Sequence, residues 1–220
     1  MHALLLERLG PQGWWPARTA EEVVVGAVLT QAVAWTNASR AIAALDDAGL
    51  LSLAALAEAP ASAVAPLIHP AGYFNVKARK LSAVSRFILA QGGLPALSAR
   101  DGAQVRQALL GVYGVGEETA DAILCYALGH PAMVCDAYAR RVLERMGLLP
   151  AAAAASYGQA RAYLVPRLPP DAAWLGEFHA LLVAVGKDWC RPRAPRCGGC
   201  PAAAGCAYAA EHEGRARRAT

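Results

Sequence analysis

Four cysteines near the C-terminal end constrain the fold of this chain more than any other feature. They follow the pattern C-x6-C-x2-C-x5-C within seventeen residues, at Cys190, Cys197, Cys200 and Cys206. So close a spacing lets four thiolates converge on one inorganic centre. Residues 190–206 would then have to wrap around that centre.

The spacing also bears on which centre is bound. Structural zinc sites usually pair their cysteines in two short knuckles, and only Cys197-Gly-Gly-Cys200 is such a pair here. A [4Fe–4S] cluster takes four thiolates and accepts wider spacing. We therefore predict a [4Fe–4S] cluster, with zinc and disulfides as the alternatives. The N-terminus lacks a signal-peptide layout, which indicates a cytoplasmic protein, and in that reducing compartment clustered cysteines bind metal more often than they form disulfides.

The loop between the first two of these cysteines is basic. Arg191, Arg193 and Arg196 share it with two prolines, which stiffen it. The arginines are either a solvated charge run or a phosphate-contacting surface, and we favour the second interpretation. The formal net charge of +4 permits an anionic partner without requiring one. Beyond Cys206 we predict a mobile basic tail with Arg215, Arg217 and Arg218.

The remainder of the chain has a helical pattern. Hydrophobic residues make up 56% of the sequence, much of it alanine and leucine, and alternating strand patterns are essentially absent. Thr19-Ala-Glu-Glu22 forms a capping box before the apolar run Val23–Val33. The apolar stretches are interrupted well before they could span a membrane. We predict an all-α protein with further helices over 37–48, 52–58, 75–91, 103–112, 117–129, 136–147, 157–166 and 171–189.

A glycine turn joins two of these helices. Gly114-Val115-Gly116 ends one helix, and the next begins immediately. The glycines permit positive φ and leave backbone N–H groups uncovered, while the next helix adds the positive end of its dipole. Such a turn can hold a DNA phosphate, although an ordinary helix–turn–helix connection has the same glycines.

A carboxylate follows twenty residues later. Asp136 stands directly before a predicted helix over Ala137–Met146. It can cap that helix, and the helix N-terminus would in turn keep the carboxylate ionised.

The glycine hairpin, the aspartate and the cysteine tail together resemble the helix-hairpin-helix DNA glycosylases of the endonuclease III superfamily. The resemblance runs from Trp14 to Cys206. It implies an all-α, two-lobed fold with a C-terminal [4Fe–4S] cluster loop. Residues 20–130 would form a helical barrel with the hairpin, and residues 1–19 plus 131–220 the iron–sulfur lobe, with Asp136 facing the cleft between them. The segments that narrow the resemblance to the endonuclease III-related branch, which includes bacterial 3-methyladenine DNA glycosylases, are Trp14-Trp15-Pro16, Leu29-Thr30-Gln31, Pro70–Asn75 and Glu118–Ile123.

This resemblance assigns the catalytic role to Asp136. Its carboxylate would stabilise the positive charge that develops on the sugar and would orient a water for attack. Family members that also nick the strand use a hairpin lysine as the Schiff-base amine. That place holds Glu118 here, and no lysine occurs between Lys80 and Lys187. We therefore predict a monofunctional enzyme that leaves the abasic strand intact.

The resemblance also names residues that would handle DNA and the damaged base. The residues that would contact DNA are Gly114, Val115, Gly116 and Thr119. Gln31 would be the wedge that occupies the space left in the duplex when the damaged base is flipped out. The Asn expected beside the wedge is Ala32 here. Trp14, Trp15 and Trp35 match base-pocket positions, where indoles stack well on a cationic alkylated purine, although tryptophans also simply fill cores.

The predicted function is thus base excision repair by a DNA N-glycosylase. It would act as a monomer on double-stranded DNA that carries a 3-methyladenine-type damaged base, with no membrane partner. One alternative is a bifunctional, endonuclease III-like glycosylase and lyase for oxidised pyrimidines. Others are a catalytically inactive DNA-binding relative and a zinc-stapled helical interaction module.

Overall fold

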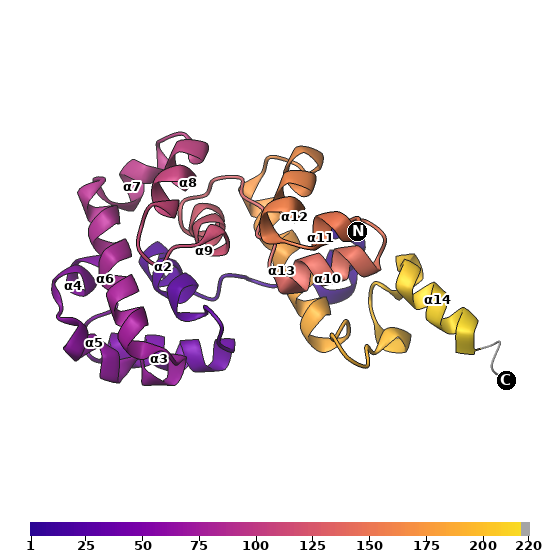
Figure 1. Cartoon of the computed structure of the whole chain (residues 1–220), viewed down its shortest axis with the longest axis horizontal. Coiled ribbons are helices and arrows are strands. Elements are labelled where there is room, and N and C mark those ends of the chain that lie inside the picture. The colour runs from indigo at the N-terminus through magenta and orange to yellow at the C-terminus, as the bar shows by residue number, and fades with distance from the viewer. Residues whose placement is uncertain (217–220) are drawn as a thin grey trace. The chain divides into compact units, whose positions relative to one another are not determined.

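The computed structural model describes residues 1–216, with side chains described as far as Glu211. Every regular element in this part of the chain is a helix, which confirms the predicted all-α class (Figure 1). Arg217 and Arg218 of the predicted basic tail lie outside the described residues, as does the side chain of Arg215.

The chain folds into two compact units. One is continuous and covers Trp15–Pro131. The other joins Met1–Trp14 to the chain from Ala132 onward. Each unit has its own buried core and is described separately.

The Trp15–Pro131 unit is built around α2 and α6. All eight residues from Glu22 to Leu29 in α2 are buried, so this helix runs through the interior and is apolar on every side. The long helix α6 packs against α4 and α5. The helices of this unit are α2 (Ala20–Leu29), α3 (Trp35–Asp47), α4 (Leu53–Glu58), α5 (Ala61–Leu67), α6 (Phe74–Ala90), α7 (Gly93–Ser98), α8 (Gly102–Leu110) and α9 (Glu117–Ala122), with a 3-10 turn at His69–Ala71 and a π-helical turn at Ile123–Ala127.

Helix α2 starts where the capping box predicts and ends earlier than the apolar run. The Thr19 hydroxyl accepts a hydrogen bond from the Glu22 N–H at 3.1 Å, which confirms the cap. The helix ends at Leu29 rather than Val33, so the prediction of a helix over Val23–Val33 was wrong at its C-terminal end. The physical reason is that Lys77 takes up the Leu29 carbonyl and the chain turns at Ala32, whose φ is 55°.

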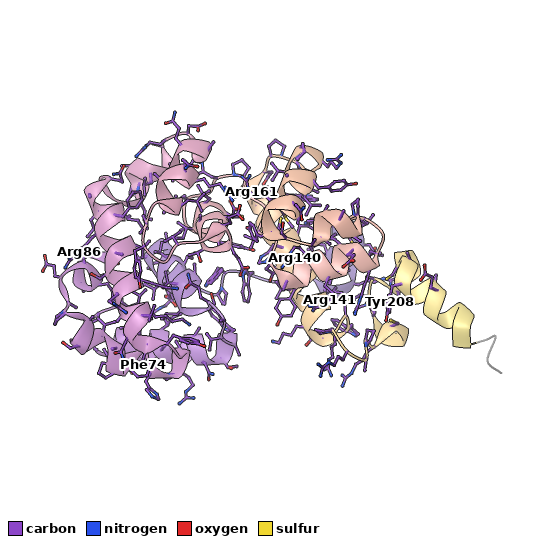
Figure 2. The ribbon with its side chains drawn as sticks, viewed as in Figure 1. Phe74, Arg86, Arg140, Arg141, Arg161 and Tyr208 are labelled. Carbon is purple, nitrogen blue, oxygen red and sulfur yellow. The ribbon has the colours of Figure 1, made fainter. Side chains whose placement is uncertain are left out.

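The second unit is built around α13. This helix packs against α10 and α1 and buries a row of apolar side chains that includes Phe178, Leu181 and Leu182. Arg141 of α10, labelled in Figure 2, donates to the backbone carbonyls of Gly186 and Cys190. The helices of this unit are α1 (His2–Leu9), α10 (Ala137–Arg145), α11 (Ala151–Ala154), α12 (Tyr157–Leu164), α13 (Ala172–Asp188) and α14 (Ala207–Ala216), with 3-10 turns at Val165–Arg167, Cys197–Gly199 and Ala203–Gly205.

None of the helices within residues 1–216 combines the length and the apolar character that a bilayer span requires.

Candidate functional site

The glycine turn lies between α8 and α9. Gly114 has a φ of 83°, and a Cβ added there would collide with the side chain of Lys80 from α6. Val115 is buried and anchors the turn. Gly116 is exposed, and a Cβ added there would have no neighbour within 4 Å. Gly114 is therefore required by conformation and by close packing, whereas Gly116 leaves an open stretch of backbone.

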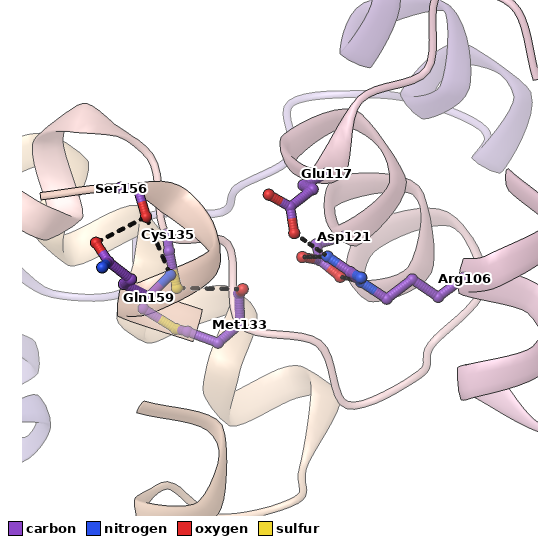
Figure 3. A network of polar contacts seen from close by, with 7 residues as sticks. All are labelled: Arg106, Glu117, Asp121, Met133, Cys135, Ser156 and Gln159. Atoms are coloured by element: carbon purple, nitrogen blue, oxygen red, sulfur yellow. Dashed lines mark hydrogen bonds and ion pairs between the residues drawn. The ribbon is translucent and has the colours of Figure 1, made fainter. Parts of the chain in front are cut away.

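A buried ion pair braces the two helices of this hairpin. The Arg106 guanidinium donates from Nε to Asp121 Oδ1 at 2.7 Å and from Nη2 to Oδ2 at 3.1 Å (Figure 3). Asp121 is fully buried, and its hydrogen bond is the main cause that raises the pKa of Arg106. Glu117 adds a third contact at 3.2 Å. The angle between α8 and α9 is thus held by charge as well as by packing.

Gln31 lies in the turn after α2 and contacts the hairpin. Its Nε2 donates to the Gly114 carbonyl at 3.0 Å and to the Thr119 hydroxyl at 2.9 Å. Its Oε1 accepts from Lys80 Nζ at 2.6 Å. The structure therefore brings together three residues that the resemblance assigned to DNA, Gln31, Gly114 and Thr119.

Lys77 was not among the predicted site residues, yet it fixes the turn that carries Gln31. The side chain is buried, and Nζ donates at 2.8 Å to each of three carbonyls, those of Leu29, Gln31 and Ala71. Burial lowers the pKa of this ammonium to about 8, and the neighbouring charge of Lys80 adds to the effect. One cation thus ties the turn after α2 to the turn before α6.

The hairpin lies close to a lysine that sequence order does not place there. Glu118, which the resemblance places where strand-nicking members have a lysine, is exposed. The side chain of Lys80, from α6, packs against Gly114. The sequence shows no lysine between Lys80 and Lys187, and it is the fold that brings Lys80 beside the hairpin.

Two of the three predicted pocket tryptophans meet in the Trp15–Pro131 unit. The rings of Trp15 and Trp35 are 5.8 Å apart and nearly perpendicular, and Tyr126 packs on Trp15 at 5.5 Å. Trp15 also lies against Gly26 of α2, where an added Cβ would come within 2.8 Å of the indole nitrogen. Trp14 falls in the other unit. Tyr126 could not be found from sequence, because its contact with Trp15 is tertiary.

Asp136 is the N-cap of α10, as its place before the helix predicted. Its Oδ1 accepts from the Ala139 N–H at 2.7 Å, and its Oδ2 lies 3.7 Å from Nε2 of His179 on α13. Burial acts to raise the pKa of this carboxyl, but His179 and the N–H groups of Ala139 and Tyr138 outweigh it. The net pKa of Asp136 lies below its ordinary value. The second unit thus holds a largely buried carboxylate in its ionised form.

The four clustered cysteines line one cavity in the second unit. Its empty volume, with the open mouth included, is about 280 Å³, and Arg145, Trp189 and Tyr208 also line it. Arg145 Nη1 lies 3.5 Å from the Cys190 sulfur. Burial raises the pKa of the Cys200 thiol, and the charges of the other three cysteines raise it further. Among the described residues, no three His, Cys, Asp or Glu side chains converge as they would around a single metal ion.

The arginines of the cysteine loop differ in exposure. Arg193 and Arg196 are exposed, and Arg191 is half-buried. Arg145 donates to the carbonyls of Arg191 and Pro192, at 2.7 and 3.0 Å, and so fixes the loop backbone to α10. The exposed pair is available to an anionic partner.

Comparison with known proteins identifies the family of the chain. The family model of the HhH-GPD superfamily base excision DNA repair proteins matches residues 25–169. A Methanocaldococcus jannaschii protein named as a DNA repair glycosylase is 39% identical over 91% of each chain. Escherichia coli endonuclease III is 30% identical over 67% of this chain and 64% of its own.

Solved structures show the same relationship. The structure of H. pylori 3-methyladenine DNA glycosylase bound to 1,N6-ethenoadenine superposes with a TM-score of 0.69 and 28% identity, over 84% of this chain and 94% of that one. An endonuclease III–DNA complex has a TM-score of 0.78 over 96% of this chain, and at 18% identity it supports the fold alone. The chain belongs to the HhH-GPD superfamily of base excision DNA repair proteins and is a DNA N-glycosylase.

Proposed function

We propose that this glycosylase is monofunctional and removes alkylated, 3-methyladenine-type bases from duplex DNA by Asp136-assisted hydrolysis. The observation that carries the proposal is the state of Asp136. Its carboxylate is largely buried, caps α10 through Oδ1 and is kept ionised by its neighbours. A buried anion of this kind is what a developing oxocarbenium ion requires.

In the proposed reaction, the carboxylate stabilises the sugar cation and accepts a proton from the attacking water. The N-glycosidic bond breaks, the base leaves, and the hydroxyl of the water bonds to C1′. An alkylated purine already carries positive charge and needs little acid catalysis to depart. The aromatic group of Trp15, Trp35 and Tyr126 offers faces and edges suited to such a base.

The hairpin supports hydrolysis without strand cleavage. Glu118 replaces the lysine that would form a Schiff base. Lys80 lies near the hairpin, but its ammonium is hydrogen-bonded to the Gln31 amide at 2.6 Å. This bond restrains the amine only while Gln31 stays on the hairpin, so hydrolysis without a Schiff base is proposed from Glu118.

Duplex binding would use three surfaces. The open backbone at Gly116 would receive a phosphate, and the exposed Arg193 and Arg196 would contact the DNA backbone. Gln31 would enter the duplex as the wedge after it exchanges its hairpin hydrogen bonds for contacts with DNA. We expect the protein to bind as a monomer in the cytoplasm.

The cysteine cavity fits a [4Fe–4S] cluster held by Cys190, Cys197, Cys200 and Cys206. Four thiols line one cavity, and four thiolates are the ligand set that a [4Fe–4S] cluster takes. When bound, such a cluster would supply redox-capable iron, and its bonds to the four cysteine thiolates would fix the loop of residues 190–206. Arg145 would offset the thiolate charge, and residues 190–206 would present their arginines.

The test is the release of bases from methylated DNA. Duplex DNA treated with dimethyl sulfate is incubated with the enzyme, and released bases are identified by chromatography. We expect 3-methyladenine to be released, and Asp136→Asn to abolish release while binding to a duplex with an abasic analogue persists. Release of oxidised pyrimidines instead, from a matched duplex, would favour the endonuclease III-like alternative. Full activity of Asp136→Asn would refute the role of the carboxylate.

A further inference from the structure

A histidine in the second unit faces the proposed catalytic carboxylate. His179 lies in the middle of α13 and is 5% exposed, which makes it one of the few buried polar side chains in the described residues. Its Nε2 is 3.7 Å from Asp136 Oδ2. No motif in the sequence points to this residue, and hydrolysis as proposed above does not use it.

The two oxygens of the carboxylate have different neighbours. Oδ1 accepts the hydrogen bond of the helix cap from Ala139 at 2.7 Å, and Oδ2 faces the imidazole. Within α10 the carboxylate is held by the N–H groups of Ala139 and Tyr138 in the turn that it caps. The contact from His179, on another helix, further restricts how the carboxylate can turn.

The place of His179 is itself well fixed. Leu175, Phe178 and Leu182 of the same helix are buried, and α13 packs closely against α10, the helix that Asp136 caps. The imidazole therefore approaches from a rigid element. At 3.7 Å the contact is longer than a hydrogen bond, and such contacts at catalytic groups often shorten only when substrate is bound.

We propose that His179 is a positioning residue, which holds Oδ2 of Asp136 so that the carboxylate is ionised and correctly turned toward the sugar and the attacking water. The inference rests on the proposed role of Asp136. Among the groups that lower the pKa of this carboxyl against its burial, His179 contributes most, in agreement with this role. Misplacement of a catalytic group by about 1 Å can cost on the order of 100-fold in rate.

The test compares His179→Leu with His179→Gln in single-turnover base release from methylated duplex DNA. Leucine removes the polar contact, whereas glutamine keeps an N–H donor of similar reach. We expect His179→Leu to slow release by about 10- to 100-fold, with affinity for an abasic-analogue duplex within about 3-fold of wild type. His179→Gln should recover most of the rate. Leu181→Ala, fully buried on the same helix, is the control for lost stability.

The outcomes separate this inference from the proposed function. Full activity of Asp136→Asn would remove the proposed role of the carboxylate and the inference with it. An inactive Asp136→Asn beside an unchanged His179→Leu would overturn the inference alone. Equal losses in the leucine and glutamine variants, matched by Leu181→Ala at similar melting temperature, would also overturn it, because His179 would then be a core residue only.

Discussion

At the scale of single residues, two lysines of α6 make the tertiary contacts that hold the turn after α2. Lys77 is buried with its ammonium on three carbonyls, and Lys80 covers Gly114 and holds Gln31. Neither contact follows from a local pattern. Both depend on α6 passing beside the turn after α2, which only the tertiary fold determines.

Replacement of Lys77 tests whether this ammonium stabilises the two turns. Lys77→Met leaves the carbonyls of Leu29, Gln31 and Ala71 without their shared donor. We expect the free energy of unfolding at pH 7 to fall by about 2–4 kcal/mol, measured by urea denaturation. Lys80→Met, whose lysine is half-buried, should cost less. A Lys77→Met protein as stable as wild type would contradict this account.

The same residue gives a pH dependence with a definite sign. The pKa of Lys77 is lowered to about 8 in the folded protein, from an ordinary value of 10.5. Between these values the unfolded chain binds more protons than the folded one, so the contribution of Lys77 to stability rises with pH. The stability difference between wild type and Lys77→Met should therefore widen from pH 8 to pH 10. A difference that narrows would show that the folded-state pKa is not lowered.

For Asp136, the sequence predicts the position at the start of a helix but not the tertiary contact of its carboxylate. Its position as a helix cap follows from a short local pattern, and the structure has that cap. Its contact with His179 joins helices more than forty residues apart, and no spacing rule predicts it. The cysteine spacing likewise predicted a common site, and the four thiols share a cavity.

At the scale of elements, the hairpin shows how two glycines in one motif serve different purposes. Gly114 has positive φ and a close neighbour, and Gly116 has neither.

The sequence predicted the turn and the helix caps well, because these depend on a few adjacent residues. It missed α1, α5 and α7, which are only six to eight residues long. It also predicted a mobile tail after Cys206, whereas residues Ala207–Ala216 form helix α14. It also predicted one helix over 117–129, whereas α9 ends at Ala122 and passes into a π-helical turn.

Substitution of each hairpin glycine separates folding from DNA contact. Gly114→Ala places a methyl group against Lys80 at a φ of 83°, so we expect the free energy of unfolding to fall by about 1–3 kcal/mol. Gly116→Ala meets open space and should change stability by less than about 0.5 kcal/mol, yet weaken duplex binding. Unfolding curves and fluorescence-anisotropy titrations measure the two effects. Unchanged DNA affinity in Gly116→Ala would show that this backbone does not contact phosphate.

At the scale of the whole molecule, the cysteine cavity and Asp136 belong to the same unit. Helix α10 links them, because Asp136 caps its first turn and Arg145 in its last turn holds the cysteine loop. The family relationship accounts for the fold and for the enzyme class. The damaged base and the fate of the strand depend on individual side chains of the site.

Loss of one cysteine tests the cluster. Cys200→Ser should abolish visible charge-transfer absorbance and reduce iron below about four per chain in metal analysis, because one ligand of the proposed cluster is lost. We also expect weaker duplex binding, since the arginine loop would no longer be fixed. Cys125→Ser, a buried cysteine outside the cavity, is the matched control. A colourless wild-type protein with one zinc ion per chain would show that the centre is not iron–sulfur.

The central claim is hydrolysis of the glycosidic bond at Asp136 without strand cleavage, and one assay tests it most directly. An end-labelled duplex with a single alkylated purine is incubated with the enzyme and divided into samples with and without later alkali. The account predicts strand breaks only after alkali and no borohydride-trapped protein–DNA complex. Breaks without alkali, together with a trapped complex, would contradict it. Loss of that complex in Lys80→Arg would then identify Lys80 as the amine.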